Sequence, residues 1–121
     1  MLHESLTSDR ELVFDVEGTL ARYGGSTELL VDMIGFFLED APKLVADLRR
    51  AAVEGDAAEV RSKAHSLKGL LAGCGGKRAA KAAQLVENAG EANDLSDLPR
   101  LLDALETQIE LLRQEAVAYR H

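Results

Sequence analysis

His65, Lys68 and Gly69 are the residues of this chain whose types and spacing could do chemistry. Residues three and four positions apart share one face of an α-helix, so an ammonium group and a position without a side chain would both neighbour the imidazole. A neutral imidazole keeps a lone pair on one ring nitrogen, which makes it a nucleophile near neutral pH. If that nitrogen took up a phosphoryl group, the Lys68 ammonium would offset its negative charge. Gly69 costs a helix roughly 1 kcal/mol relative to Ala, which makes sense if something large must approach His65.

The residues alone leave other interpretations of His65 open. A histidine on the outer face of a helix is often an ordinary surface residue. A metal site is poorly supported, because zinc needs about three or four nitrogen, sulfur or oxygen ligands. The positions one turn from His65 are occupied by Arg61, Ser62, Lys68 and Gly69, none of which is a histidine or cysteine. We therefore expect no metal bound by this chain.

The segment Ala64-His65-Ser66-Leu67-Lys68-Gly69, followed by Ala72 and Gly75, resembles the signature of histidine-containing phosphotransfer domains. Such domains are small helical bundles that pass a phosphoryl group between receiver-domain aspartates in bacterial and fungal signalling relays. The similarity extends over nearly the whole chain. Leu70 stands where many members have a small residue, which bears on the choice of partner more than on the chemistry.

The resemblance implies roles for individual residues. His65 would be the phosphoacceptor, Lys68 would steady the phosphoryl group, and Gly69 would keep the approach open. Glu87 would hold the proton of the second ring nitrogen, because many members of the family have Glu or Gln at that position. The resemblance also implies a modest docking patch around His65, which we assign to Arg61, Gly69, Leu70 and Ala72.

The function implied is that of a phosphorelay intermediate. It would accept a phosphoryl group on His65 from a receiver-domain aspartyl phosphate or a kinase and pass it to another receiver domain. The expected partners are response-regulator receiver domains and a hybrid histidine kinase. The chain would bind no cofactor, and Mg²⁺ would be held by the partner receiver. One alternative is a non-catalytic helical adaptor, and another is an enzyme such as a phosphohistidine phosphatase or a histidine-kinase fragment.

The elements that must position these residues are predicted to be helices throughout. Apolar residues recur at helical spacing and no stretch alternates like a strand, so we expect an all-α, antiparallel four-helix bundle with one or two short extra N-terminal helices. The predicted helices cover about 11–22, 26–40, 40–54, 56–73, 77–89 and 97–116, with a break at Pro42. Asp56 is expected to cap the helix of His65. Residues 1–8 are predicted to be a flexible arm and residues 9–121 to form one domain.

Composition and charge limit the possible partners. The net charge of −7 argues against nucleic acid. Residues 49–81 nevertheless hold eight Lys and Arg against three acidic residues, so this stretch carries +5 and the remainder −12. A basic region around His65 would steer anionic partners toward it. With one cysteine, no apolar run long enough to span a membrane and no signal peptide, we expect a cytoplasmic monomer.

Overall fold

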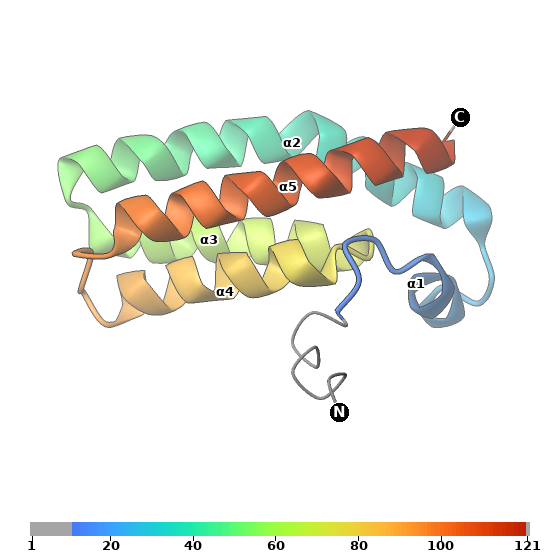
Figure 1. The fold of residues 1–121 in the computed structure, drawn as a ribbon, viewed down its shortest axis with the longest axis horizontal. Helices are drawn as coiled ribbons and strands as arrows, with labels where there is room; N and C mark the ends of the chain where they lie inside the picture. Colours follow the sequence, from blue (N-terminus) through green and yellow to red (C-terminus); the bar gives the residue numbers. More distant parts are fainter. Residues whose placement is uncertain (1–10, 121) are drawn as a thin grey trace, which may run out of the picture.

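The computed structural model describes residues 11–120, which form five helices (Figure 1). Four long helices run antiparallel as a bundle, and one short helix lies at one end of it. The helices are α1 (Val16–Arg22), α2 (Thr27–Glu54), α3 (Ala57–Gly73), α4 (Lys77–Glu91) and α5 (Leu98–Arg120). The predicted all-α bundle is confirmed, with one extra N-terminal helix. The predicted flexible arm at 1–8 lies outside the described residues.

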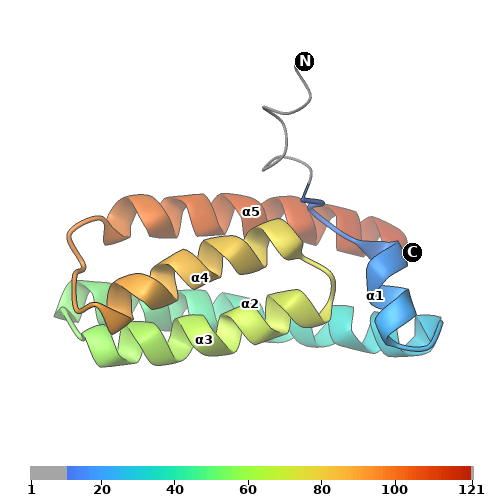
Figure 2. The same ribbon diagram turned by 90° about the horizontal axis from the view of Figure 1, so that it is seen from below.

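Helices α3 and α4 lie side by side as a hairpin, and Gly90 shows how closely they approach (Figure 2). A Cβ atom on Gly90 would lie 2.7 Å from the backbone nitrogen of Arg61 and 2.9 Å from the carbonyl oxygen of Ala57. Ala79 and Ala83, which are also buried, place only small side chains on the inner side of α4. The small residues of α4 therefore allow its close approach to α3.

Helix α2 is continuous through Pro42, so the predicted break near residue 40 is wrong. A proline inside a helix costs about 3 kcal/mol, because it removes a hydrogen bond and crowds the preceding turn. The buried side of α2 continues past it, with Phe37 and Ala41 before the proline and Leu48 and Ala51 after it. Each fully buried large apolar side chain contributes about 1.5–3 kcal/mol. Packing on both sides of Pro42 therefore outweighs its local cost.

Helix α1 begins at Val16, later than the predicted start at 11. The carboxylate of Asp15 caps it by accepting a hydrogen bond from Gly18 N at 3.0 Å. Residues 11–14 are irregular, and the buried Phe14 packs edge-on against Tyr119 with ring centroids 5.6 Å apart. The apolar spacing that suggested helix here serves instead to fasten this segment to α5.

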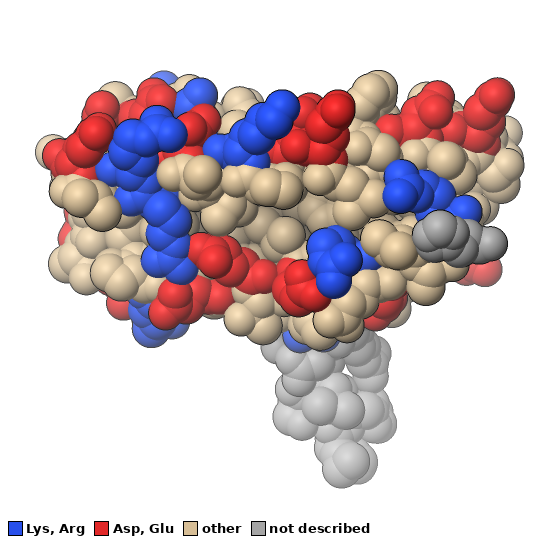
Figure 3. Space-filling model, turned by 90° about the horizontal axis from the view of Figure 1, so that it is seen from above, with Lys and Arg blue, Asp and Glu red and all other residues tan. Residues whose placement is uncertain are grey.

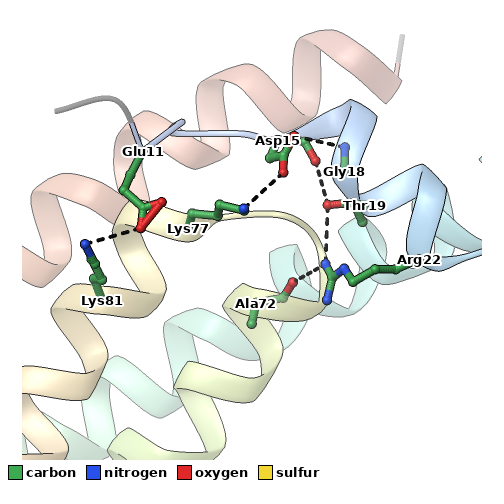
Figure 4. A network of polar contacts seen from close by, with 8 residues as sticks. All are labelled: Glu11, Asp15, Gly18, Thr19, Arg22, Ala72, Lys77 and Lys81. Carbon is green, nitrogen blue, oxygen red and sulfur yellow. Dashed lines mark hydrogen bonds and ion pairs between the residues drawn. The ribbon is translucent and has the colours of Figure 1, made fainter. Parts of the chain in front are cut away.

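Residues 11–23, called the N-terminal segment below, also contact the turn between α3 and α4 (Figure 4). The last carbonyl groups of a helix have no partner within it. Here Arg22 donates to the carbonyl oxygen of Ala72 at 3.0 Å, and the Tyr23 hydroxyl donates to that of Gly73. In the turn itself, Asp15 N donates to Gly75 O at 2.8 Å. The end of α3 is therefore fixed by residues fifty or more positions earlier in the chain.

Helix α3 has the two faces that the sequence predicts. Its cap is confirmed, because the Asp56 carboxylate accepts from Glu59 N at 3.1 Å. One side of the helix, formed by Val60, Leu67, Leu71 and its cap residue Cys74, is fully buried. Burial raises the pKa of the Cys74 thiol to about 11, as expected of a core residue. The opposite side of α3 is left to face outward.

The face formed by α2 and α5 is turned away from the α3–α4 hairpin (Figure 3). The Arg49 guanidinium joins these two helices through Asp103 at 2.8 Å and Glu106 at 2.6 Å. A hollow beside these ion pairs is lined mainly by apolar side chains, including Phe37 and Ile109. None of the described helices is both long and apolar enough to cross a membrane.

Candidate functional site

His65 stands on the outward face of α3, with 66 % of its side chain exposed. Its neighbours Ala64 and Leu67 are fully buried, and they fix the rotation of the helix that turns the imidazole outward. The ring is therefore held on a rigid element and can be reached by another molecule.

Glu87 approaches the imidazole from α4. Its Oε2 atom lies 3.1 Å from Nδ1 of His65, although 22 residues separate the two in sequence. Only 11 % of the Glu87 side chain is exposed, so the carboxylate lies beneath the ring rather than in solvent. An ionised carboxylate only accepts hydrogen bonds, so this contact favours the imidazole tautomer with its proton on Nδ1. Among residues 11–120 no hydrogen-bond partner is found for Nε2.

Lys68 reaches the same carboxylate from α3. Its Nζ atom lies 2.9 Å from Oε1 of Glu87 and 2.8 Å from Oε1 of Gln84. The two carboxylate oxygens of Glu87 are thus divided between the two side chains of α3, Oε2 to the imidazole and Oε1 to the ammonium. Residues three apart on α3 therefore share one buried acidic group on α4.

The charge of Glu87 is maintained despite burial. Desolvation alone would raise the pKa of its carboxyl group, since burial disfavours the charged form. The contact with the Lys68 ammonium, an ion pair of 2.9 Å, outweighs this effect, the contact with His65 acts in the same direction as Lys68, and the pKa of Glu87 is lowered below its ordinary value. The site therefore places an ionised carboxylate between the Lys68 side chain and the imidazole ring.

Gly69 leaves open space next to His65. No atom lies within 4 Å of the position where its Cβ would be, in contrast to the crowded Gly90. Beyond it, a groove of about 600 Å³ runs between α3, α4 and the N-terminal segment. Gly69 and Ala72 line this groove, as does the ammonium of Lys68.

The groove is bordered by further cations. Arg22, Lys77 and Lys81 line it together with Lys68 and Gln84. The positive charge is partly compensated, since Lys77 lies 3.4 Å from Asp15 and Lys81 lies 3.2 Å from Glu11 (Figure 4).

The predicted site residues are thus not all brought together. His65, Lys68 and Glu87 meet, and Gly69 and Ala72 lie beside them along the groove. Arg61 is exposed one turn before His65, and Leu70 is half-buried against the core, so neither lines the groove.

Gln84 and Arg22 were missed by the sequence analysis. Gln84 precedes Glu87 by three residues and shares its face of α4, which was a usable signal once Glu87 had been chosen. Arg22 enters through the packing of α1 against the α3–α4 turn, for which the sequence offers no local signal. Within the described part of the chain, no group of three or more His, Cys, Asp or Glu residues is placed to hold a metal ion.

Comparison with known proteins agrees with this arrangement. The family model described as Hpt domain matches residues 32–115, more than half of the chain and the whole of α3 and α4. The crystal structure of histidine-containing phosphotransfer protein B from Pseudomonas aeruginosa PAO1 superposes with a TM-score of 0.81 over 89 % of this chain and 94 % of that one. At 21 % identity this likeness is one of fold. No curated protein sequence matches the chain.

Proposed function

This chain belongs to the Hpt domain family, whose members have a phosphotransfer role in phosphorelays, and we propose that His65 is the residue that accepts the phosphoryl group. The observation that carries the proposal is the contact between Nδ1 of His65 and Oε2 of Glu87. A proton held on Nδ1 leaves the lone pair on Nε2, the nitrogen free to react.

The reaction follows from that protonation state. The lone pair of Nε2 forms a bond to phosphorus while the bond from phosphorus to the aspartyl oxygen of a partner breaks. The aspartyl carboxylate leaves with the electron pair of that bond. The imidazole ring then carries positive charge, which the buried carboxylate of Glu87 offsets from the Nδ1 side. Transfer to a second receiver is the reverse of these steps.

Lys68 and Gly69 serve the incoming group in different ways. The Lys68 ammonium lies one turn from His65 and supplies positive charge for the phosphoryl oxygens, since phosphoryl transfer depends mainly on positioning and charge neutralisation. Gly69 leaves the space through which a partner's phosphoaspartate approaches. The half-exposed Leu70 and Ala72, with Arg61 on the other side of His65, would extend the docking patch.

The partners we propose are response-regulator receiver domains and a hybrid histidine kinase. The cationic groove of Arg22, Lys68, Lys77 and Lys81 suits a receiver, whose phosphorylation site is built from acidic residues. Those acidic residues would hold Mg²⁺, and this chain would contribute no cofactor of its own. We place the protein in the cytoplasm and expect it to act as a monomer.

The experiment is a transfer assay with radiolabelled, phosphorylated receiver domains from the same organism in the presence of Mg²⁺. Wild type is expected to take up label that is lost in acid and stable in base, the behaviour of a phosphorylated imidazole. His65→Gln is expected to take up none. A variant with Gln at positions 3 and 121, the other two histidines, is the matched control and is expected to be labelled normally.

Two results would contradict the proposal. If His65→Gln were labelled like wild type, the phosphoacceptor would be another residue. If wild type took up no label from any receiver yet bound receivers in a pull-down, the chain would be the non-catalytic adaptor.

A further inference from the structure

Lys68 is held by two acceptors of different kinds. Glu87 Oε1, 2.9 Å from its ammonium, is charged and is also tied to the imidazole through the other oxygen of the same carboxylate. Gln84 Oε1, at 2.8 Å, is neutral and has no contact with His65. The direction of the ammonium is therefore set by a pair of groups, of which only one shares in the charge of the reacting ring.

Gln84 is itself oriented. Its Nε2 donates to Oδ1 of Asn88 at 2.7 Å, one turn further along α4. A lysine ammonium can only donate, so the oxygen of the Gln84 amide must face Lys68 and its NH₂ group must face away. Asn88 accepts from that NH₂ group and so holds the amide in the orientation that Lys68 requires. Residues 84, 87 and 88 share one face of α4 and together oppose residues 65 and 68 of α3.

We propose that Gln84 is a positioning residue for phosphotransfer, which holds the Lys68 ammonium beside His65 while Glu87 changes its charge partners. The proposal rests on the proposed role of His65. Before transfer, the Glu87 carboxylate faces one full positive charge, that of Lys68. Once Nε2 binds phosphorus, the ring becomes cationic and competes with Lys68 for the same carboxylate. Lys68 is then released in part toward the phosphoryl oxygens, and Gln84 is the contact that it keeps.

The lack of charge on Gln84 matters for how Lys68 acts on a phosphoryl group. An ammonium held by two carboxylates would present little net positive charge to a phosphoryl group, and the second carboxylate would repel that group. An amide oxygen directs the ammonium by a hydrogen bond without cancelling its charge. An acceptor without negative charge is thus the suitable second partner for Lys68.

The test measures the phosphorylation rate of His65 by phosphoramidate, a small donor that needs no docking surface. Nε2 attacks its phosphorus and ammonia leaves. Gln84→Leu removes the acceptor and is expected to slow the reaction roughly tenfold, the effect of losing one hydrogen bond to a charged group. Gln84→Glu keeps an acceptor but adds a charge, and we expect it to be slower still.

Leu85→Glu is the matched control. It adds the same negative charge to α4, at an exposed position next to Gln84 that takes no part in the contacts of Lys68. Its rate is expected to stay within about twofold of wild type, because an added charge at an exposed position is screened by water. All three variants are expected to unfold at the wild-type temperature, since residues 84 and 85 lie outside the core.

A second measurement follows Lys68 directly. In an NMR spectrum of lysine side-chain ammonium groups, the Lys68 signal is expected to be visible in wild type and in Leu85→Glu, because hydrogen bonding slows its exchange with water. It is expected to weaken in Gln84→Leu. A purely structural role for Gln84 would lower the unfolding temperature without this selective change.

The outcomes separate this inference from the proposed function. If wild type and Gln84→Leu are phosphorylated on His65 at equal rates, the inference is wrong and the role of His65 stands. If Leu85→Glu slows the reaction as much as Gln84→Glu, general surface charge is responsible and the inference is again wrong. If wild type takes up no phosphoryl group on His65 from phosphoramidate or from any receiver, the proposed function itself has failed.

Discussion

Nδ1 of His65 and Oε2 of Glu87 lie 3.1 Å apart across the interface between α3 and α4. This contact depends on the register of the hairpin, which is set by the α3–α4 turn at one end and by the close approach at Gly90 at the other. The carboxylate is buried and the imidazole is mostly exposed, so the pair connects the interior of the bundle to its reactive surface.

Glu87 is expected to control which nitrogen of His65 carries the proton. In wild type the contact favours the proton on Nδ1, and Glu87→Ala removes the one acceptor that residues 11–120 offer to this nitrogen. The nitrogen chemical shifts of the imidazole are expected to move toward the tautomer with the proton on Nε2, which predominates when nothing holds Nδ1. Phosphorylation by phosphoramidate is expected to slow roughly tenfold, because the reactive lone pair is then less often available and the cationic ring loses its counter-charge.

Glu87→Gln separates the two contributions. Its amide oxygen still accepts from Nδ1–H, so the tautomer is expected to stay as in wild type while the rate falls because the negative charge is gone. Unchanged nitrogen shifts in Glu87→Ala would show that Glu87 does not set the tautomer.

Gly69 and Gly35 form a matched pair for testing access to His65. Both lie inside helices and neither has an atom within 4 Å of its missing Cβ, but Gly35 is in α2. Alanine at either position is expected to stabilise the protein by about 1 kcal/mol in urea unfolding, through helix propensity alone. Gln at 69 is expected to slow transfer from a receiver roughly tenfold, because a long side chain displaces the partner. Gln at 35 should leave transfer unchanged, and equal rates for the two variants would remove Gly69 from the docking patch.

Gly90→Ala is expected to destabilise the protein, in contrast to alanine at position 69 or 35. The added methyl group would lie 2.7 Å from Arg61 N and 2.9 Å from Ala57 O, both backbone atoms that cannot rotate away. Overpacking of this kind costs about 1–3 kcal/mol, and it outweighs the gain in helix propensity. The overpacking should push α4 away from α3. Since Glu87 is three residues from position 90 on α4, this displacement should also slow phosphorylation of His65. Urea unfolding checks the first effect and phosphoramidate the second, and a variant as stable as wild type would mean that α3 and α4 are not held this close.

The sequence predicted best where a local signal decides the structure. The cap at Asp56 and the apolar spacing from Val60 to Cys74 define α3 completely, and so they orient His65. Pro42 misled because its effect on the backbone is local, whereas the burial that keeps α2 continuous comes from the helices packed against it. The start of α1 was misplaced for a related reason, since Phe14 is apolar in order to contact Tyr119 rather than to continue a helix.

The residues of the site also divide into those that local helical geometry relates and those that only the packing of different helices brings together. Residues 65, 68 and 69 were predicted as neighbours because helical geometry fixes their relation. Glu87 came from family resemblance, since no spacing rule relates residues on two different helices. The spacing of Gln84 from Glu87 could have placed it on the same face of α4, but its contact with Lys68 needs the side-chain geometry. Arg22 needs the packing of α1, for which a single sequence offers no signal.

The buried carboxylate of Glu87 should also make the free energy of unfolding depend on pH, and this dependence should require Lys68. The folded-state pKa of Glu87 lies below its ordinary value of 4.5, chiefly because of its contact with the Lys68 ammonium. A group with a depressed folded-state pKa contributes stability above its unfolded value and loses it as the pH falls through the folded value. The free energy of unfolding in urea is therefore expected to fall between neutral pH and a pH well below 4.5, and to fall less in Lys68→Met.

Exposed carboxyl groups with lowered pKa values, such as that of Glu110, add to the fall equally in both proteins and cancel in the comparison. Lys63→Met removes the same charge from α3 but only longer ion pairs, at 3.6 and 3.8 Å, and should keep the wild-type dependence. If Lys68→Met lost as much stability in acid as wild type, the ammonium would not be what keeps Glu87 charged beneath the imidazole.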